Sequence, residues 1–93
     1  MKNEYHYDQD LLQELRQLAL SCGPDANKHD EAIVLIKACI EAGLNTEDII
    51  IGALHRIGCN PAHIAVMLSV THRKYPGHGH WRRDKSGVYS LIA

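Results

Sequence analysis

The chain of 93 residues has no phenylalanine, and aromatic residues make up only 5% of it. No apolar run approaches the roughly 18 residues of a membrane-spanning helix, and residues 1–10 have no hydrophobic signal-peptide segment. The three cysteines, Cys22, Cys39 and Cys59, form an odd set without a CxxC pair. Such a set argues against a disulfide framework and fits a reducing compartment. We therefore expect a cytoplasmic protein without membrane association.

Motifs of catalysis are also missing. There is no glycine-rich phosphate loop, no HExxH and no GxSxG motif. Those motifs place phosphate-binding amides, metal ligands or nucleophiles at fixed spacing. We expect no catalytic residues, no enzyme activity, no small-molecule substrate and no cofactor.

What is present indicates one small domain. Hydrophobic residues make up 45% of the chain and charged residues 23%, which is ordinary for a globular protein. A chain of this length has room for one core. We expect a single domain over residues 1–93, with residues 1–45 as a helical support and residues 46–92 as a helix-turn-helix and wing.

Apolar residues recur at helical spacing in the first half of the chain. They predict a helix over residues 10–22, capped by Asp8 or Asp10, and a second helix over residues 30–42. Gly43 follows the second helix, where a left-handed C-cap favours glycine. The residues expected to face the core are Leu11, Leu15, Leu18, Cys22, Ile33, Ile36, Cys39 and Ile40.

A third helix is predicted over residues 47–57, with Asn45 or Thr46 as its cap. Its middle is apolar on almost all sides, which is typical of a helix covered on more than one face. Gly52 lowers the stability of this helix by about 1 kcal/mol relative to alanine. We expect a close helix crossing at Gly52 to compensate.

The break at Gly58 precedes a strong signal for a fourth helix. Asn60 can accept hydrogen bonds from unpaired amides, and Pro61 lies where its missing N–H costs least. The helix is expected to reach about His72, with inward anchors at Ile64, Met67 and Leu68.

After an expected turn at residues 75–77, residues 81–92 predict a β-hairpin. Residues 84–87 suit a type I turn closed by a left-handed glycine. This turn places Trp81 opposite Leu91, Arg83 opposite Tyr89, and Arg82 opposite Ser90. The fold class is therefore mainly α, with four helices, a helix-turn-helix and a C-terminal β-hairpin wing, and Trp81 is expected to anchor the hairpin.

From Thr46 to Ile92 the chain resembles the winged helix-turn-helix superfamily of DNA-binding regulators. The resemblance consists of a small residue in the first helix, glycine at the turn, and apolar residues around the turn and in the second helix. These residues are Ala53, Gly58, Ile57, Cys59, Ile64 and Met67. The resemblance to this superfamily implies that the fourth helix enters the major groove and that the wing touches the DNA backbone or minor groove. The groove-facing candidates it implies are Asn60, Ala62, His63, Val66, Ser69 and Arg73, and the wing candidates are Arg82, Arg83 and Lys85.

The charges are divided along the chain. Residues 1–53 carry four Lys or Arg and ten Asp or Glu, a balance of −6. Residues 54–93 carry six Lys or Arg and one Asp, a balance of +5. Such asymmetry is typical of a chain with one anion-facing end. We expect Arg73 and Lys74 to form one basic surface with the wing, and we expect a transcriptional regulator that binds double-stranded DNA as a homodimer.

Other interpretations remain open. The outward side of the fourth helix, at Ala62, Val66 and Val70, is poor in the side chains that read base edges, so this face can instead bind a protein partner. The wing cations can be a solvated hairpin tip that prevents edge pairing. Arg73 and Lys74 also stabilise the helix dipole.

Histidines are numerous near the C-terminal half. His63, His72, His78, His80 and Cys59 are residue types that bind zinc. Their spacing matches no established zinc motif, and imidazoles beside Arg and Lys also suit phosphate. We expect no bound metal.

Overall fold

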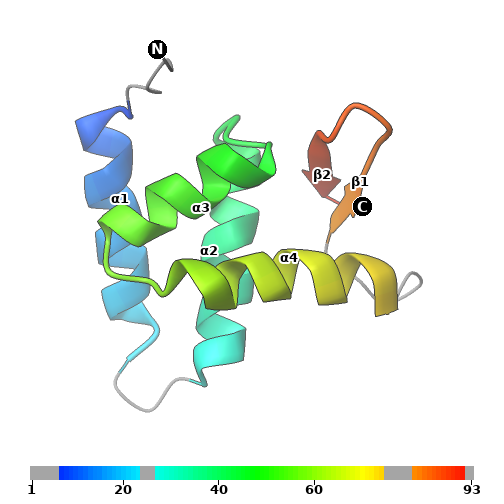
Figure 1. The fold of residues 1–93 in the computed structure, drawn as a ribbon. Helices are drawn as coiled ribbons and strands as arrows, with labels where there is room; N and C mark the ends of the chain where they lie inside the picture. Colours follow the sequence, from blue (N-terminus) through cyan, green and yellow to red (C-terminus); the bar gives the residue numbers. More distant parts are fainter. Residues whose placement is uncertain (1–6, 24–26, 75–80, 92–93) are drawn as a thin grey trace.

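The computed structural model describes residues 7–23, 27–74 and 81–91, without the side chains of His29 and residues 70–74. The elements, in order, are α1 (Gln9–Ser21), α2 (Lys28–Glu41), α3 (Glu47–Arg56), α4 (Pro61–Lys74), β1 (Trp81–Arg83) and β2 (Tyr89–Leu91). Figure 1 shows α1 and α2 running alongside each other, α3 crossing them, and the hairpin above the C-terminal half of α4. The predicted fold class is confirmed. The turn expected at residues 75–77 lies outside the described residues.

Glycine ends the helix before the turn that leads into α4. Gly58 has a φ of +106°, and its amide donates to the His55 carbonyl at 3.0 Å. The Cys59 amide donates to the Leu54 carbonyl at 2.9 Å. These two bonds satisfy carbonyls that the helix end leaves unpaired. Gly43 ends α2 with a φ of +94°, which confirms the predicted left-handed C-cap.

Side chains cap the starts of α1 and α4. The Asp8 carboxylate accepts a hydrogen bond from the Asp10 amide at 2.9 Å, so Asp8 is the cap of α1. The Asn60 Oδ1 atom accepts from the amides of Ala62 at 2.8 Å and His63 at 3.3 Å. The predicted role of Asn60 as the cap of α4 is confirmed, because two of the unpaired amides at the helix start bind its side chain.

The hairpin has the predicted register and an additional attachment. Trp81 pairs with Leu91, and Arg83 pairs with Tyr89. An isolated bridge joins Thr46 to Val88, and the Tyr89 amide donates to the Asn45 carbonyl at 2.7 Å. The second strand is therefore bonded on both edges, to β1 and to the segment that precedes α3.

The structure confirms one of the two predicted caps of α3, Thr46, at the level of position. Thr46 occupies the N-cap position, but its side chain makes no capping hydrogen bond within the described structure. Its backbone is extended, with φ −117° and ψ 156°, as is usual for an N-cap residue, and it forms a bridge to Val88. The start of α3 is held by this strand-like pairing rather than by a hydroxyl cap.

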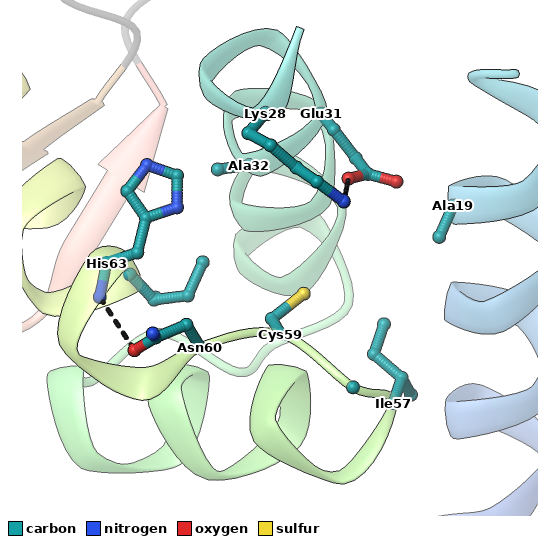
Figure 2. Close-up of a pocket in the computed structure, with 10 residues that line it drawn as sticks. Ala19, Lys28, Glu31, Ala32, Ile57, Cys59, Asn60 and His63 are labelled. Atoms are coloured by element: carbon teal, nitrogen blue, oxygen red, sulfur yellow. Dashed lines mark hydrogen bonds and ion pairs between the residues drawn. The ribbon is translucent and has the colours of Figure 1, made fainter. Parts of the chain in front are cut away.

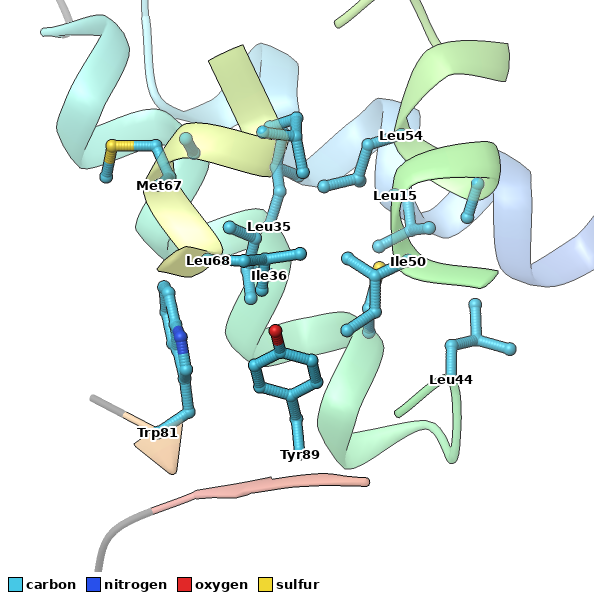
Figure 3. Close-up of a cluster of buried hydrophobic side chains, with 14 of the residues drawn as sticks. Leu15, Leu35, Ile36, Leu44, Ile50, Leu54, Met67, Leu68, Trp81 and Tyr89 are labelled. Atoms are coloured by element: carbon cyan, nitrogen blue, oxygen red, sulfur yellow. The ribbon is translucent and has the colours of Figure 1, made fainter. Parts of the chain in front are cut away.

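The core joins all four helices to the hairpin. Trp81 and Tyr89 extend from the hairpin toward Leu68 and Ile36 (Figure 3). The inward face of α2 includes Leu35, which the sequence pattern did not select, while Ile33 and Ile40 are only partly buried. The buried core residues are Leu12, Leu15, Ala32, Leu35, Ile36, Cys39, Leu44, Ile50, Ala53, Leu54, Ile64, Met67, Leu68, Trp81 and Tyr89.

The close approach at Gly52 involves a side chain and not a second helix, so the expected helix crossing is wrong. A Cβ atom at Gly52 would collide with the hydroxyl of Tyr7. That hydroxyl donates to the Ile49 carbonyl at 3.0 Å. The Arg56 guanidinium lies 4.4 Å from the centre of the Tyr7 ring. Glycine therefore makes room for Tyr7, which ties the segment before α1 to α3.

None of the described helices combines the length and apolar character needed to cross a membrane.

Candidate nucleic-acid interface

A hydrogen-bonded turn shapes the tip of the hairpin. The Asp84 Oδ1 atom accepts from the Ser86 amide at 2.9 Å, the Ser86 hydroxyl at 2.7 Å and the Val88 amide at 3.0 Å. These bonds, the one from the Ser86 hydroxyl first, hold the pKa of Asp84 below its ordinary value. Gly87 closes the turn with a φ of +88°, which confirms the predicted left-handed glycine. The hydrogen bonds of the Asp84 carboxylate are thus made within the turn.

Three cations surround this turn. Arg82, Arg83 and Lys85 are all exposed. In residues 7–23, 27–74 and 81–91, the ion pair that the structure contains joins Lys28 to Glu31 and involves no hairpin residue. The hairpin tip therefore presents positive charge that no carboxylate side chain of the described residues pairs.

The hairpin is held firmly under these cations. The Trp81 side chain is 1% exposed and that of Tyr89 is 3% exposed. Burial, with a smaller contribution from Glu47, raises the pKa of Tyr89, and Arg83 opposes this shift. Contacts of β1 with α4 and of β2 with α2 fix the hairpin against the helices. The cations thus project from a hairpin whose other end is packed against the helices.

The outer face of α4 is small and apolar. Val66 is 55% exposed, Ala62 is exposed and Ser69 is half-buried. The 14 residues of α4 include no Asp or Glu. An anion approaching this face therefore meets no negative side chain of α4.

The remaining predicted DNA contacts lie at different places along α4. Asn60 is exposed at the start of α4, where it also serves as the cap. His63 is half-buried and lines a pocket beside Lys28 of α2 (Figure 2). The backbones of Arg73 and Lys74 belong to the last turn of α4, and their side chains lie outside the described set. Their continuity with the wing stays a prediction.

The expected absence of metal also stays a prediction. Among the described residues, no group of three or more His, Cys, Asp or Glu side chains could hold a metal ion. His78 and His80 and the side chain of His72 lie outside that set. Burial raises the pKa of Cys59, with Glu31 adding to the shift and Lys28 opposing it, so this thiol is a weaker ligand than an ordinary cysteine at neutral pH.

The pocket beside His63 was not predicted from the sequence. It brings Lys28 and Glu31 of α2 next to Cys59 and His63, which are about thirty residues away in the chain. The hydrophobic periodicity of a sequence predicts which face of a helix is apolar. It does not predict which other helices pack beside that face. No local signal in the sequence marks this site.

Comparison of the chain with known protein families, with curated proteins and with solved structures gave no match. The function proposed below therefore depends on the geometry and charge of this chain.

Proposed function

We propose that this protein binds double-stranded DNA and acts as a transcriptional regulator. In this proposal α4 lies along the major groove and the hairpin tip contacts the phosphate backbone. The observation that carries it is the set of exposed cations at Arg82, Arg83 and Lys85, which no described carboxylate pairs. Lys and Arg that neutralise phosphates provide most of the affinity of non-specific DNA binding.

The attachment of the hairpin to the helices supports this proposal. Buried Trp81 and Tyr89 and the bridge between Thr46 and Val88 hold the tip relative to the helix-turn-helix. A preorganised tip loses little conformational entropy when it meets DNA, which favours binding. The Asp84 turn has the same consequence, because it fixes the backbone between Arg83 and Lys85.

The outer face of α4 favours recognition of DNA shape over recognition of bases. Ala62 and Val66 have no hydrogen-bonding side chains, and bases are discriminated mainly by Arg, Lys, Asn or Gln at base edges. Phosphate contacts set the position of a protein on the duplex, and sequence-dependent deformability then provides specificity. The proposed DNA contacts are Asn60, His63, Ser69, Arg73, Lys74, Arg82, Arg83 and Lys85.

The proposal includes a homodimer that works in the cytoplasm. A two-fold symmetric dimer matches palindromic sites and places two copies of α4 in successive turns of the major groove. Leu20 of α1 is 73% exposed, and such a side chain gains free energy when a second copy covers it.

A protein partner is the second candidate function. It is favoured by the exposure of Val66, since Ala62 and Val66 together form an apolar surface on α4. Val70, also expected on this surface, has a side chain outside the described set. Apolar surface of this kind mediates protein contacts when it is extensive.

Fluorescence anisotropy with labelled duplexes of several sequences separates the two functions. We expect Arg82→Ala to weaken binding to all duplexes alike, by about five- to tenfold at 0.1 M salt. Arg16→Ala is the matched control, because it removes the same charge from the exposed side of α1, and it should leave the affinity unchanged. A substitution at Ser69 should instead change the preference among sequences. Absence of binding at low salt would contradict DNA binding and favour the partner at Val66.

A further inference from the structure

A pocket of about 580 Å³ lies between the end of α1, the start of α2 and the turn from α3 to α4 (Figure 2). Its volume is within the range of roughly 300–1,000 Å³ that is typical of small-molecule sites. The proposed DNA interface uses only His63 and Asn60 of its lining. The pocket therefore needs an explanation of its own.

The lining combines apolar and polar side chains. Figure 2 shows Ala19 and Ile57 on one side and Asn60 and His63 on the other, with the Cys59 thiol between them. Pockets that bind small molecules commonly combine apolar walls with a few polar groups that orient the ligand. A lining of this composition suits a molecule with one polar end and one apolar end.

The polar side offers donors. The Oδ1 atom of Asn60 already accepts from two amides of α4, so the group that its side chain can offer a ligand is the NH₂ donor. The Lys28 ammonium is 3.6 Å from the Glu31 carboxylate, and the two side chains are 85% and 20% exposed. An ion pair with so exposed a partner contributes little to stability. The Lys28 ammonium has three N–H donors, so it can contact a ligand while it remains beside Glu31.

The helix ends add positive potential. Lys28 is the first residue of α2, and Pro61, next to Asn60, is the first residue of α4. The start of a helix carries partial positive charge that favours anions. Glu31 is the acidic residue of the lining, and Lys28 offsets part of its charge.

We propose that this pocket binds a small amphipathic anion, with its carboxylate or phosphate head at Lys28, Asn60 and His63 and its apolar tail against Ala19 and Ile57. The ligand would touch α1, α2 and both sides of the turn that leads into α4. The proposal shares Asn60 and His63 with the proposed DNA interface, but it does not depend on the hairpin cations, because Lys28, Ala19 and Ile57 complete the lining of the pocket.

Titration of isotope-labelled protein with hexanoate, followed by amide chemical shifts, tests the site. Hexanoate is used up to about 20 mM, well above the roughly 1 mM dissociation constant that a ligand of this size reaches. We expect saturable shifts at the amides of Lys28, Glu31, Cys59 and His63. Hexyl phosphate should bind at the same residues, whereas hexylammonium should bind more weakly, because its charge is opposite.

A pair of lysine variants shows whether the head group contacts Lys28. Lys28→Gln should weaken hexanoate binding by about two- to fivefold, as expected for an exposed charge. Lys37→Gln removes the same charge elsewhere on α2 and should have no effect. Both substitutions are conservative changes on a helix, and the unperturbed spectra report whether each variant is folded. The proposal is wrong if no saturable shifts appear, if hexylammonium binds as tightly as hexanoate, or if the two variants bind alike.

Discussion

Trp81 joins the hairpin to the helices through one side chain. Its indole ring is almost fully buried beside Leu68 and Tyr89 (Figure 3). A two-stranded hairpin is barely stable by itself in water, so β1 and β2 depend on contacts with the rest of the chain, and Trp81 provides a large one. The position of the exposed cations near Asp84 therefore depends on a residue that is itself hidden from any ligand.

Replacement of Trp81 by alanine should lower the free energy of unfolding by about 3–5 kcal/mol, because it removes a large buried ring and leaves a cavity. Trp81→Phe should recover part of the loss, since an aromatic ring still fills the site. Urea denaturation followed by circular dichroism measures both values. A midpoint for the alanine variant that equals that of the wild type would contradict the anchoring role.

Cys39 makes stability depend on pH in the alkaline range. Burial, with a smaller contribution from Cys59, raises the pKa of Cys39 from 9.0 to about 12. The folded state thus keeps a proton that the unfolded state loses above pH 9, so this contribution to stability is complete below pH 9 and is lost as the pH rises toward 12. We expect the wild type to lose up to about 1.4 kcal/mol per pH unit more than Cys39→Ala over this range. Parallel denaturation curves of the two proteins from pH 8 to pH 11 make the comparison, and equal pH profiles would show that the thiol is not protected.

At the scale of the elements, the start of α4 combines capping with a proposed DNA contact. Asn60 holds two amides of α4 and lies directly after the Gly58 turn. Loss of its side chain affects both the helix and any contact with phosphate. A substitution that keeps the cap is needed to separate these two roles.

Asn60→Asp separates them, because aspartate caps a helix about as well as asparagine and its charge suits the helix dipole. We expect its free energy of unfolding to stay within about 0.5 kcal/mol of the wild type, whereas Asn60→Ala should lose about 1 kcal/mol. DNA binding should weaken in Asn60→Asp, since a carboxylate then faces the phosphates. Thermal melts and anisotropy on the same samples provide both readouts. Unchanged DNA affinity would exclude Asn60 from the interface.

The elements that could be predicted from the sequence are those with local signals. Gly43, Gly58 and Asn60 mark helix ends through the backbone geometry and the hydrogen bonds that they favour. The turn at residues 84–87 sets the register of the hairpin in the same local way. Even so, α2 begins at Lys28, two residues before the expected start.

The features that were missed depend on contacts between distant segments. Tyr7 over Gly52 and the bridge between Thr46 and Val88 join residues more than forty positions apart. The pocket beside His63 likewise arises only where α2 meets the turn before α4. The hydrophobic periodicity of the sequence predicts which face of a helix or strand is apolar, but it does not identify the segment that packs against that face.

For the whole molecule, the separation of charge along the chain is the central feature. Residues 1–53 have a negative charge balance and repel a polyanion, whereas residues 54–93 have a positive balance and attract it. In the described structure the hairpin cations remain exposed, while the carboxylate of Asp84, which lies between them in the chain, is held in the turn. Net charge near zero therefore conceals a local surface that suits phosphate.

The salt dependence of DNA binding tests this account most directly. Each phosphate contact contributes about −0.9 to the slope of log affinity against log salt concentration, so Arg82, Arg83 and Lys85 together predict a slope of at least about −2.7. The double variant Arg82→Ala, Arg83→Ala should flatten the slope by about 1.8 units while its melting temperature stays unchanged, because both side chains are exposed. A slope that is the same in the wild type and the double variant, or no binding at low salt, would contradict the proposed interface.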